Sequence, residues 1–66
     1  MQIQLNGDAR SFDAPCTVLE LLAREHLAER RVAVEVNGAI IPRSAHATHA
    51  LQNGDQVEIV HALGGG

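Results

Sequence analysis

A chain of 66 residues forms one small domain, and a chain of this length buries only about 60% of its unfolded surface. Apolar residues make up 45% of it, which indicates a globular fold with an aliphatic core, because Phe12 is the only aromatic residue. The net charge of −3 and the lack of lysine disfavour binding to nucleic acid or an anionic membrane. So small a body has little room for a substrate pocket, which favours a carrier or binding module over an enzyme.

The first segment is predicted to be a β-hairpin. Residues 1–5 alternate apolar and polar side chains, and Asn6-Gly7 is a strong hairpin-turn signal. A second strand should run from about residue 9 to 13, with Phe12 turned inward and Arg10 toward solvent, until Pro15 ends it.

A helix is predicted next, from residue 18 to about residue 28. Thr17 and Glu20 have the spacing of a capping box, in which each side chain bonds the other residue's backbone amide. The apolar stripe of this helix comprises Val18, Leu21 and Leu22. Arg30 and Arg31 are expected near its C-terminal end, where positive charge is favourable.

The middle of the chain predicts a second hairpin followed by a less regular segment. Residues 32–37 alternate with valine on one face, Asn37-Gly38 gives the turn, and residues 39–41 form a short partner strand that Pro42 stops. Residues 43–50 have no clear period and are expected to be a loop, with one helical turn begun by Ser44. Leu51 should return to the core.

The last strand follows the turn at residues 53–55. Alternation places Val57, Ile59 and His61 on one face. The simplest closure puts this strand between the two hairpins, parallel to the first strand, with the helix across one face of the sheet. The sequence therefore predicts an α+β fold with a mixed sheet of four to five strands.

Three glycines, Gly64, Gly65 and Gly66, follow that strand and are expected to form a flexible tail after a folded domain of residues 1–63. A tail of three residues reaches at most roughly 10 Å. A terminal carboxylate is anionic and a poor electrophile, so chemistry at Gly66 needs prior activation, for instance as a mixed anhydride with AMP. A frayed end or an expression scar is the alternative interpretation.

The outward side of the last strand is a candidate docking surface beside this tail. Alternation turns Glu58, Val60 and Ala62 away from the core, and Leu63 can anchor the tail to the body or to a partner. Ordinary scattered surface apolarity is an equal alternative.

The other side chains that could bind a metal or act as acids and bases are interpreted as structural. Three histidines, His46, His49 and His61, are enough for a zinc site, but the first two lie in an irregular segment, so solvated loop histidines are favoured and no metal site is expected. Glutamates 20, 25 and 29 recur at helical spacing as a solvated face.

The single cysteine, Cys16, cannot form an internal disulfide and indicates a reducing compartment. Its neighbours provide no cation, so a structural role is favoured for its thiol. The first residues do not show the charged-then-apolar pattern of a leader peptide, and no apolar run approaches the length of a membrane span, so a soluble protein in the cytoplasm is expected.

Together these segments resemble the ubiquitin-like β-grasp sulfur carriers, and among them those of thiamin biosynthesis. The resemblance covers nearly the whole chain and rests on the order of short motifs, which are Met1-Gln2-Ile3 with Asn6-Gly7, Thr17-Val18 with Glu20-Leu21-Leu22, Val34 to Asn37, Ile40-Ile41-Pro42-Arg43, Gly54-Asp55, Val57-Glu58-Ile59-Val60 and the terminal triple glycine.

The resemblance implies a function as a co-substrate and not as an enzyme. A ubiquitin-activator-like adenylyltransferase would use ATP to adenylate Gly66, and a persulfide from a cysteine desulfurase would convert it to a thiocarboxylate. That sulfur would then pass to thiazole synthase. No bound cofactor is implied. The alternatives are the small subunit of molybdopterin synthase, which shares the fold and the glycine end, and a ubiquitin-like protein modifier or interaction module.

Overall fold

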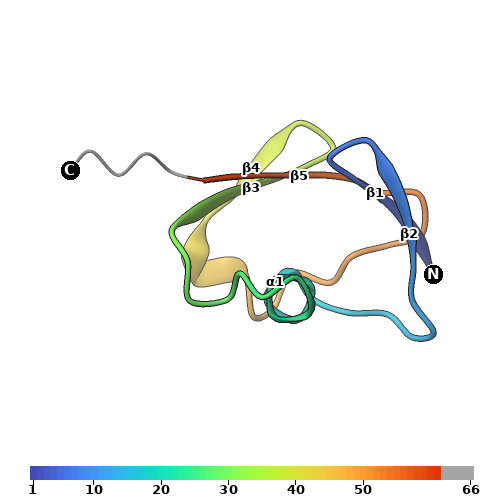
Figure 1. The fold of residues 1–66 in the computed structure, drawn as a ribbon, viewed down its shortest axis with the longest axis horizontal. Coiled ribbons are helices and arrows are strands. Elements are labelled where there is room, and N and C mark those ends of the chain that lie inside the picture. The colour runs from blue at the N-terminus through green and yellow to red at the C-terminus, as the bar shows by residue number, and fades with distance from the viewer. Residues whose placement is uncertain (62–66) are drawn as a thin grey trace.

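The computed structural model describes residues 1–61 (Figure 1). In chain order the elements are β1 (Gln2–Leu5), β2 (Asp8–Ser11), α1 (Val18–Arg24), β3 (Val32–Val36), β4 (Ala39–Ile41), the 3₁₀ helix η1 (Arg43–Ala45) and β5 (Gln56–His61).

The strands form one mixed sheet in the order β2-β1-β5-β3-β4. β5 lies in the centre, parallel to β1 and antiparallel to β3, while the other neighbouring pairs are hairpins. Figure 1 shows α1 across one face of the sheet. The predicted α+β class, the central last strand and the single covering helix are confirmed, and the sheet has five strands.

The core lies between α1 and the covered face of the sheet. It is aliphatic apart from one thiol, as the composition predicts, and its buried members are Ile3, Leu5, Cys16, Val18, Leu21, Leu22, Val34, Val36, Leu51, Val57 and Ile59. Leu51 therefore does return to the core.

Helix α1 begins where predicted and ends earlier. Both capping-box bonds form: Glu20 N donates to Thr17 Oγ1 at 3.2 Å, and Thr17 N donates to Glu20 Oε1 at 2.8 Å. The predicted end near residue 28 is wrong, because His26 takes the left-handed conformation with φ of 61°. The amide of Leu27 then bonds Leu22 O and that of His26 bonds Ala23 O, the pattern of a Schellman motif.

This early stop alters the role of the residues after the helix. Leu27 packs against the core from outside the helix, next to the end of the apolar stripe. The two arginines predicted at the helix C-terminus, Arg30 and Arg31, lie several residues beyond it, so that interpretation is wrong as well. Arg24 is the basic residue of the last turn.

The first hairpin differs from its prediction in length and in its contacts. β2 ends at Ser11, and Phe12 is partly buried just after it, with the Arg24 guanidinium 5.1 Å from its ring centroid. Arg10 is exposed as predicted, yet its Nη1 lies 2.8 Å from Glu25 Oε2. Glu25 therefore ties the end of α1 to β2 and is not simply part of a solvated face.

Residues 43–50 have no clear hydrophobic period in their sequence, and hydrogen bonds to the start of α1 hold them in place. The free amides at the start of α1 donate to this segment, Val18 N to His49 O at 3.0 Å and Leu19 N to His46 O at 2.9 Å. The helical turn begins after Pro42, with no side-chain cap from Ser44.

His46 is buried, with 6% of its surface exposed, so the prediction of a solvated loop histidine is wrong for it. Its Nε2 lies 3.0 Å from Ile41 O, which satisfies one ring nitrogen. His49 is half-buried and His61 is exposed.

Candidate functional site: the end of the central strand

The central strand β5 is held on both sides by the asparagines of the two hairpin turns. Beyond the end of β1, the Asn6 side chain continues the ladder: Ile59 N donates to its Oδ1 at 2.8 Å, and its Nδ2 donates to Ile59 O at 3.2 Å. On the other side, Gln56 N donates to Asn37 Oδ1 at 2.9 Å. β5 is therefore anchored by two side chains that do not belong to the sheet's own backbone ladder.

The same two asparagines have positive φ, 51° at Asn6 and 52° at Asn37, and each precedes a glycine with positive φ. This is the geometry of type I′ turns, which the Asn-Gly pairs predicted. A residue here must tolerate the left-handed region and also carry a donor and an acceptor, and asparagine meets both needs.

Alternation along β5 divides its side chains between the two faces of the sheet. Val57 and Ile59 are buried beneath α1, whereas Glu58 and Val60 are exposed on the other face, hereafter the outer face. Val60 is 58% exposed. The sequence-based assignment of faces is therefore confirmed for residues 57–60, whereas His61, predicted on the face of Val57 and Ile59, is exposed at the end of the strand.

Neighbouring strands extend this exposed surface in a way that the sequence analysis missed. Across from β5, Glu35 is directly opposite Glu58, and Ala33 is opposite Val60. Ile40 on β4 pairs with Glu35 and is 70% exposed. The signal for it was the Ile40-Ile41 pair, because adjacent residues in a strand face opposite sides and one of the two must point outward.

We call Ala33, Glu35, Ile40, Glu58 and Val60 the outer patch. It combines two exposed aliphatic side chains with two carboxylates that face each other, next to the end of β5. The remaining candidate residues, Ala62, Leu63, Gly64, Gly65 and Gly66, lie outside the described residues. The predicted boundary between a 1–63 domain and a 64–66 tail also stays a prediction.

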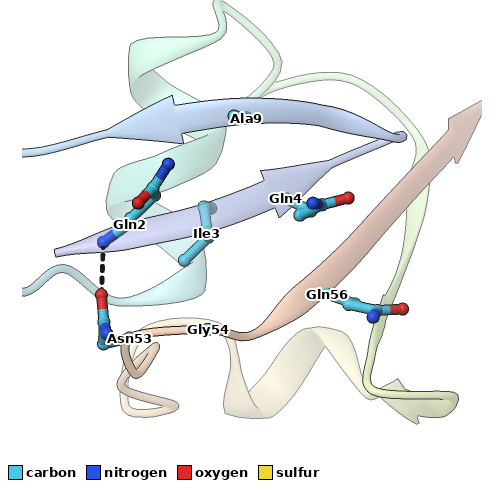
Figure 2. A pocket seen from close by; sticks show the side chains of 7 residues that line it. All are labelled: Gln2, Ile3, Gln4, Ala9, Asn53, Gly54 and Gln56. Atoms are coloured by element: carbon cyan, nitrogen blue, oxygen red, sulfur yellow. Dashed lines mark hydrogen bonds between the residues drawn. The ribbon is translucent and has the colours of Figure 1, made fainter.

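The other end of β5 has a different surface. A hollow of about 300 Å³ lies there, lined in part by Gln2, Gln4 and Gln56. Figure 2 shows the side chains that line it. The Asn53 side chain closes one side and accepts a hydrogen bond from Gln2 N at 2.8 Å. None of these side chains titrates, so the hollow is polar without charge or acid–base chemistry.

The described residues offer little for catalysis. Within residues 1–61 no group of three or more histidine, cysteine, aspartate or glutamate side chains is placed to hold a metal ion. Cys16 is buried, and burial raises the pKa of its thiol, an effect that Arg24 opposes and Glu20 reinforces. A neutral, buried thiol is a poor nucleophile, in keeping with the structural role predicted for it.

No helix in the described part of the chain has the length and apolarity needed to cross a membrane.

Comparison with known proteins places this arrangement in a class. The fold matches the crystal structure of the thiamine biosynthesis protein ThiS from Geobacter metallireducens with a TM-score of 0.86 and 33% identity over the full length of both chains. The architecture is therefore the ubiquitin-like β-grasp, with one helix held by a mixed sheet.

The family is established by two further matches. The ThiS family model matches residues 3–66, and the sulfur carrier protein ThiS of Escherichia coli is 36% identical over all of both chains. This chain belongs to the ThiS family. It is also 44% identical, over its whole length, to part of a thiazole synthase of Paramagnetospirillum magneticum. The chain spans about a fifth of the length of that relative.

Proposed function

We propose that this chain is a sulfur carrier of thiamin biosynthesis. The full-length match to the E. coli sulfur carrier ThiS, which extends through the glycines, carries the proposal. The architecture supports it, because the central strand is anchored on both sides and its last described residue immediately precedes the segment that ends in Gly66.

The reactive group in this proposal is the carboxylate of Gly66. A ubiquitin-activator-like adenylyltransferase joins it to the AMP portion of ATP and releases pyrophosphate. A persulfide that originates from a cysteine desulfurase then attacks the acyl carbon, and AMP leaves. Cleavage of the resulting acyl disulfide by a thiol leaves the thiocarboxylate. The chain supplies the acyl group and the recognition surface, and the partner supplies ATP and the catalytic side chains.

The outer patch is proposed to dock the adenylyltransferase. Glu58 and Val60 lie on it, alternation extends the predicted surface to Ala62, and Leu63 is predicted to anchor the tail to the body or to the partner. Covering exposed aliphatic side chains stabilises a complex, since apolar surface removed from water contributes roughly 25 cal/mol per Å² of favourable free energy. Ile40 and Val60 are therefore the side chains expected to contribute most to binding.

The acceptor of the sulfur is proposed to be a thiazole synthase. Two proteins named thiazole synthase, from Paramagnetospirillum magneticum and Magnetococcus marinus, match this whole chain over 20% of their own length. A carrier segment joined to a synthase acts at a high effective concentration, which suggests that the two activities belong together.

The test is an intact-mass measurement. The protein is incubated with an adenylyltransferase of this kind, ATP and a persulfide source. The expected mass increase is that of one sulfur replacing one oxygen, and tandem mass spectrometry should place it on Gly66. An unchanged mass, under conditions that convert the E. coli ThiS protein, would refute the proposal. The mass of the protein isolated from its own cells would also establish whether the natural polypeptide ends at Gly66.

A deletion and a growth assay complete the test. Removing Gly66 should abolish sulfur loading while the melting temperature stays within about 1 °C, because the anchored part of β5 is unchanged. A strain without the protein should need thiamin and be rescued by the thiazole alcohol. Loss of molybdoenzyme activity in place of that requirement would assign the chain to molybdenum cofactor synthesis.

A further inference from the structure

A second hollow lies on the helix side of the sheet, away from the outer patch. Its volume is about 180 Å³, and it is formed where α1, the segment after β4 and the start of β3 meet. Figure 1 shows α1 and the segment around residues 43–50 on the same side of the sheet. The carrier function proposed above assigns no role to this hollow.

The walls of the hollow combine apolar and cationic groups. Leu19, which is 40% exposed, lines it together with Leu22 and Val32, and Arg30 and Arg43 line it as well. A ligand that fills it must therefore present an aliphatic group and a negative charge close to each other.

The arginines of the hollow are free to bind such a charge. Arg10 is paired with Glu25, and Arg24 lies over the Phe12 ring. Within residues 1–61, by contrast, neither Arg30 nor Arg43 has a carboxylate within ion-pair distance. A protein of net charge −3 thus places two unpaired guanidinium groups around a single hollow. Guanidinium groups bind carboxylates through two parallel hydrogen bonds, and more strongly where water is partly excluded.

His46 adds a polar atom that favours a peptide over a small oxyanion. Its Nε2 lies 3.0 Å from the carbonyl of Ile41, so in the neutral ring Nε2 carries the proton and Nδ1 is an acceptor. His46 lines the hollow, and within the described residues its Nδ1 takes part in no hydrogen bond. An acceptor suits a peptide N–H, whereas most oxygens of a phosphate at neutral pH carry only lone pairs.

We propose that this hollow binds an acidic segment of a partner protein, with an aspartate or glutamate side chain on Arg30 and Arg43 and an adjacent aliphatic side chain against Leu19 and Leu22. The segment's backbone N–H donates to His46 Nδ1. The site is separate from the outer patch, so a partner can be held on both sides of the sheet or two partners can bind at once.

The experiment is a titration of the ¹⁵N-labelled full chain, followed by the amide signals of Leu19 and Ala47 and the Nε–Hε signals of the arginines. The probes are the peptide acetyl-Leu-Asp-Leu-amide, its neutral counterpart acetyl-Leu-Asn-Leu-amide, and inorganic phosphate. The Asp peptide should give saturable shifts at the hollow, with an affinity at least fivefold higher than that of the other two probes. Equal binding of phosphate would overturn the proposal in favour of a general anion site, and no saturable shift at the hollow would overturn it altogether.

Three variants locate the binding. Arg30→Gln and Arg43→Gln should each weaken the Asp peptide at least fivefold, while Arg31→Gln, the matched control outside the hollow, should change it less than twofold. An equal loss in all three would show nonspecific attraction and overturn the site. The Gly66 deletion should bind the peptide unchanged, so failure of this proposal and failure of the carrier function are distinguishable.

Discussion

The two faces of the sheet use the same alternation of side chains for different purposes. On the covered face Ile3, Val34 and Val57 are at most 1% exposed, and they pack against α1. On the outer face the intervening positions carry glutamines at one end and the outer patch at the other. Adjacent residues of a strand therefore serve different purposes. Those on the covered face stabilise the fold, those on the outer face are available for recognition, and each set can be changed without the other.

The largest loss of stability is expected from a substitution in the core beneath the covered face. Leu21 is fully buried in α1, and Leu21→Ala removes apolar contacts and leaves a cavity, at a cost of about 3 kcal/mol. In a domain of this size that loss lowers the melting temperature by about 12–24 °C. Urea denaturation followed by circular dichroism measures it. A cost below about 1 kcal/mol would mean that α1 contributes little to the stability of the fold.

The next largest loss of stability is expected at Asn6, whose side chain anchors β5. Asn6→Ala deletes both side-chain bonds to Ile59 and leaves alanine in the left-handed region, so we expect a loss of about 2 kcal/mol. The matched control, Asn6→Asp, keeps an acceptor for Ile59 N but places a carboxylate oxygen where Nδ2 donates to Ile59 O, and it should cost less than Asn6→Ala because one of the two bonds remains. Equal costs for the two variants in urea denaturation would contradict the role given to the acceptor, Asn6 Oδ1.

The outer face should respond in binding and not in stability. Val60→Asp removes an exposed aliphatic side chain from the outer patch, so we expect less than about 0.5 kcal/mol of destabilisation. Affinity for the adenylyltransferase should fall at least tenfold, about 1.4 kcal/mol. Calorimetric titration gives the affinity.

The control for this prediction carries the same added charge elsewhere on the outer face. Ser11 is exposed on β2, which β1 separates from β5, and it pairs with Gln2 near the start of β5, whereas Val60 is near its end. Ser11→Asp should therefore leave the affinity within about twofold. If both variants bind equally well, or equally poorly, Val60 is not part of the docking surface.

The smallest predicted effect is a gain in stability on the outer face, opposite in sign to the loss predicted for the covered face. Glu58→Gln removes one of two carboxylates that lie directly opposite each other, so stability should rise by a few tenths of a kcal/mol at low salt. The gain should shrink as salt screens the pair. A loss of stability at low salt would indicate that Glu58 makes a favourable contact that outweighs its repulsion from Glu35.

Local signals in the sequence were sufficient for much of the fold. The Asn-Gly turns and the Thr17–Glu20 capping box depend on residues close together in the chain, and both appear as predicted. The end of α1 was missed because a left-handed terminator is usually glycine, whereas His26 takes this role here. The burial of His46 was missed because it depends on an amide of α1 more than twenty residues earlier in the chain.

By itself, the amino-acid sequence determined the alternation along β5, and with it which side chains could face the core and which could face outward. Only the tertiary structure decided that Glu35 lies between Ile40 and Glu58, that two turn asparagines anchor β5, and that Arg30 and Arg43 line one hollow. The physical reason is that alternation and turn geometry are local properties of the backbone. Neighbours across a sheet, by contrast, depend on which strands pair, and the whole chain settles that pairing when it buries its apolar surface.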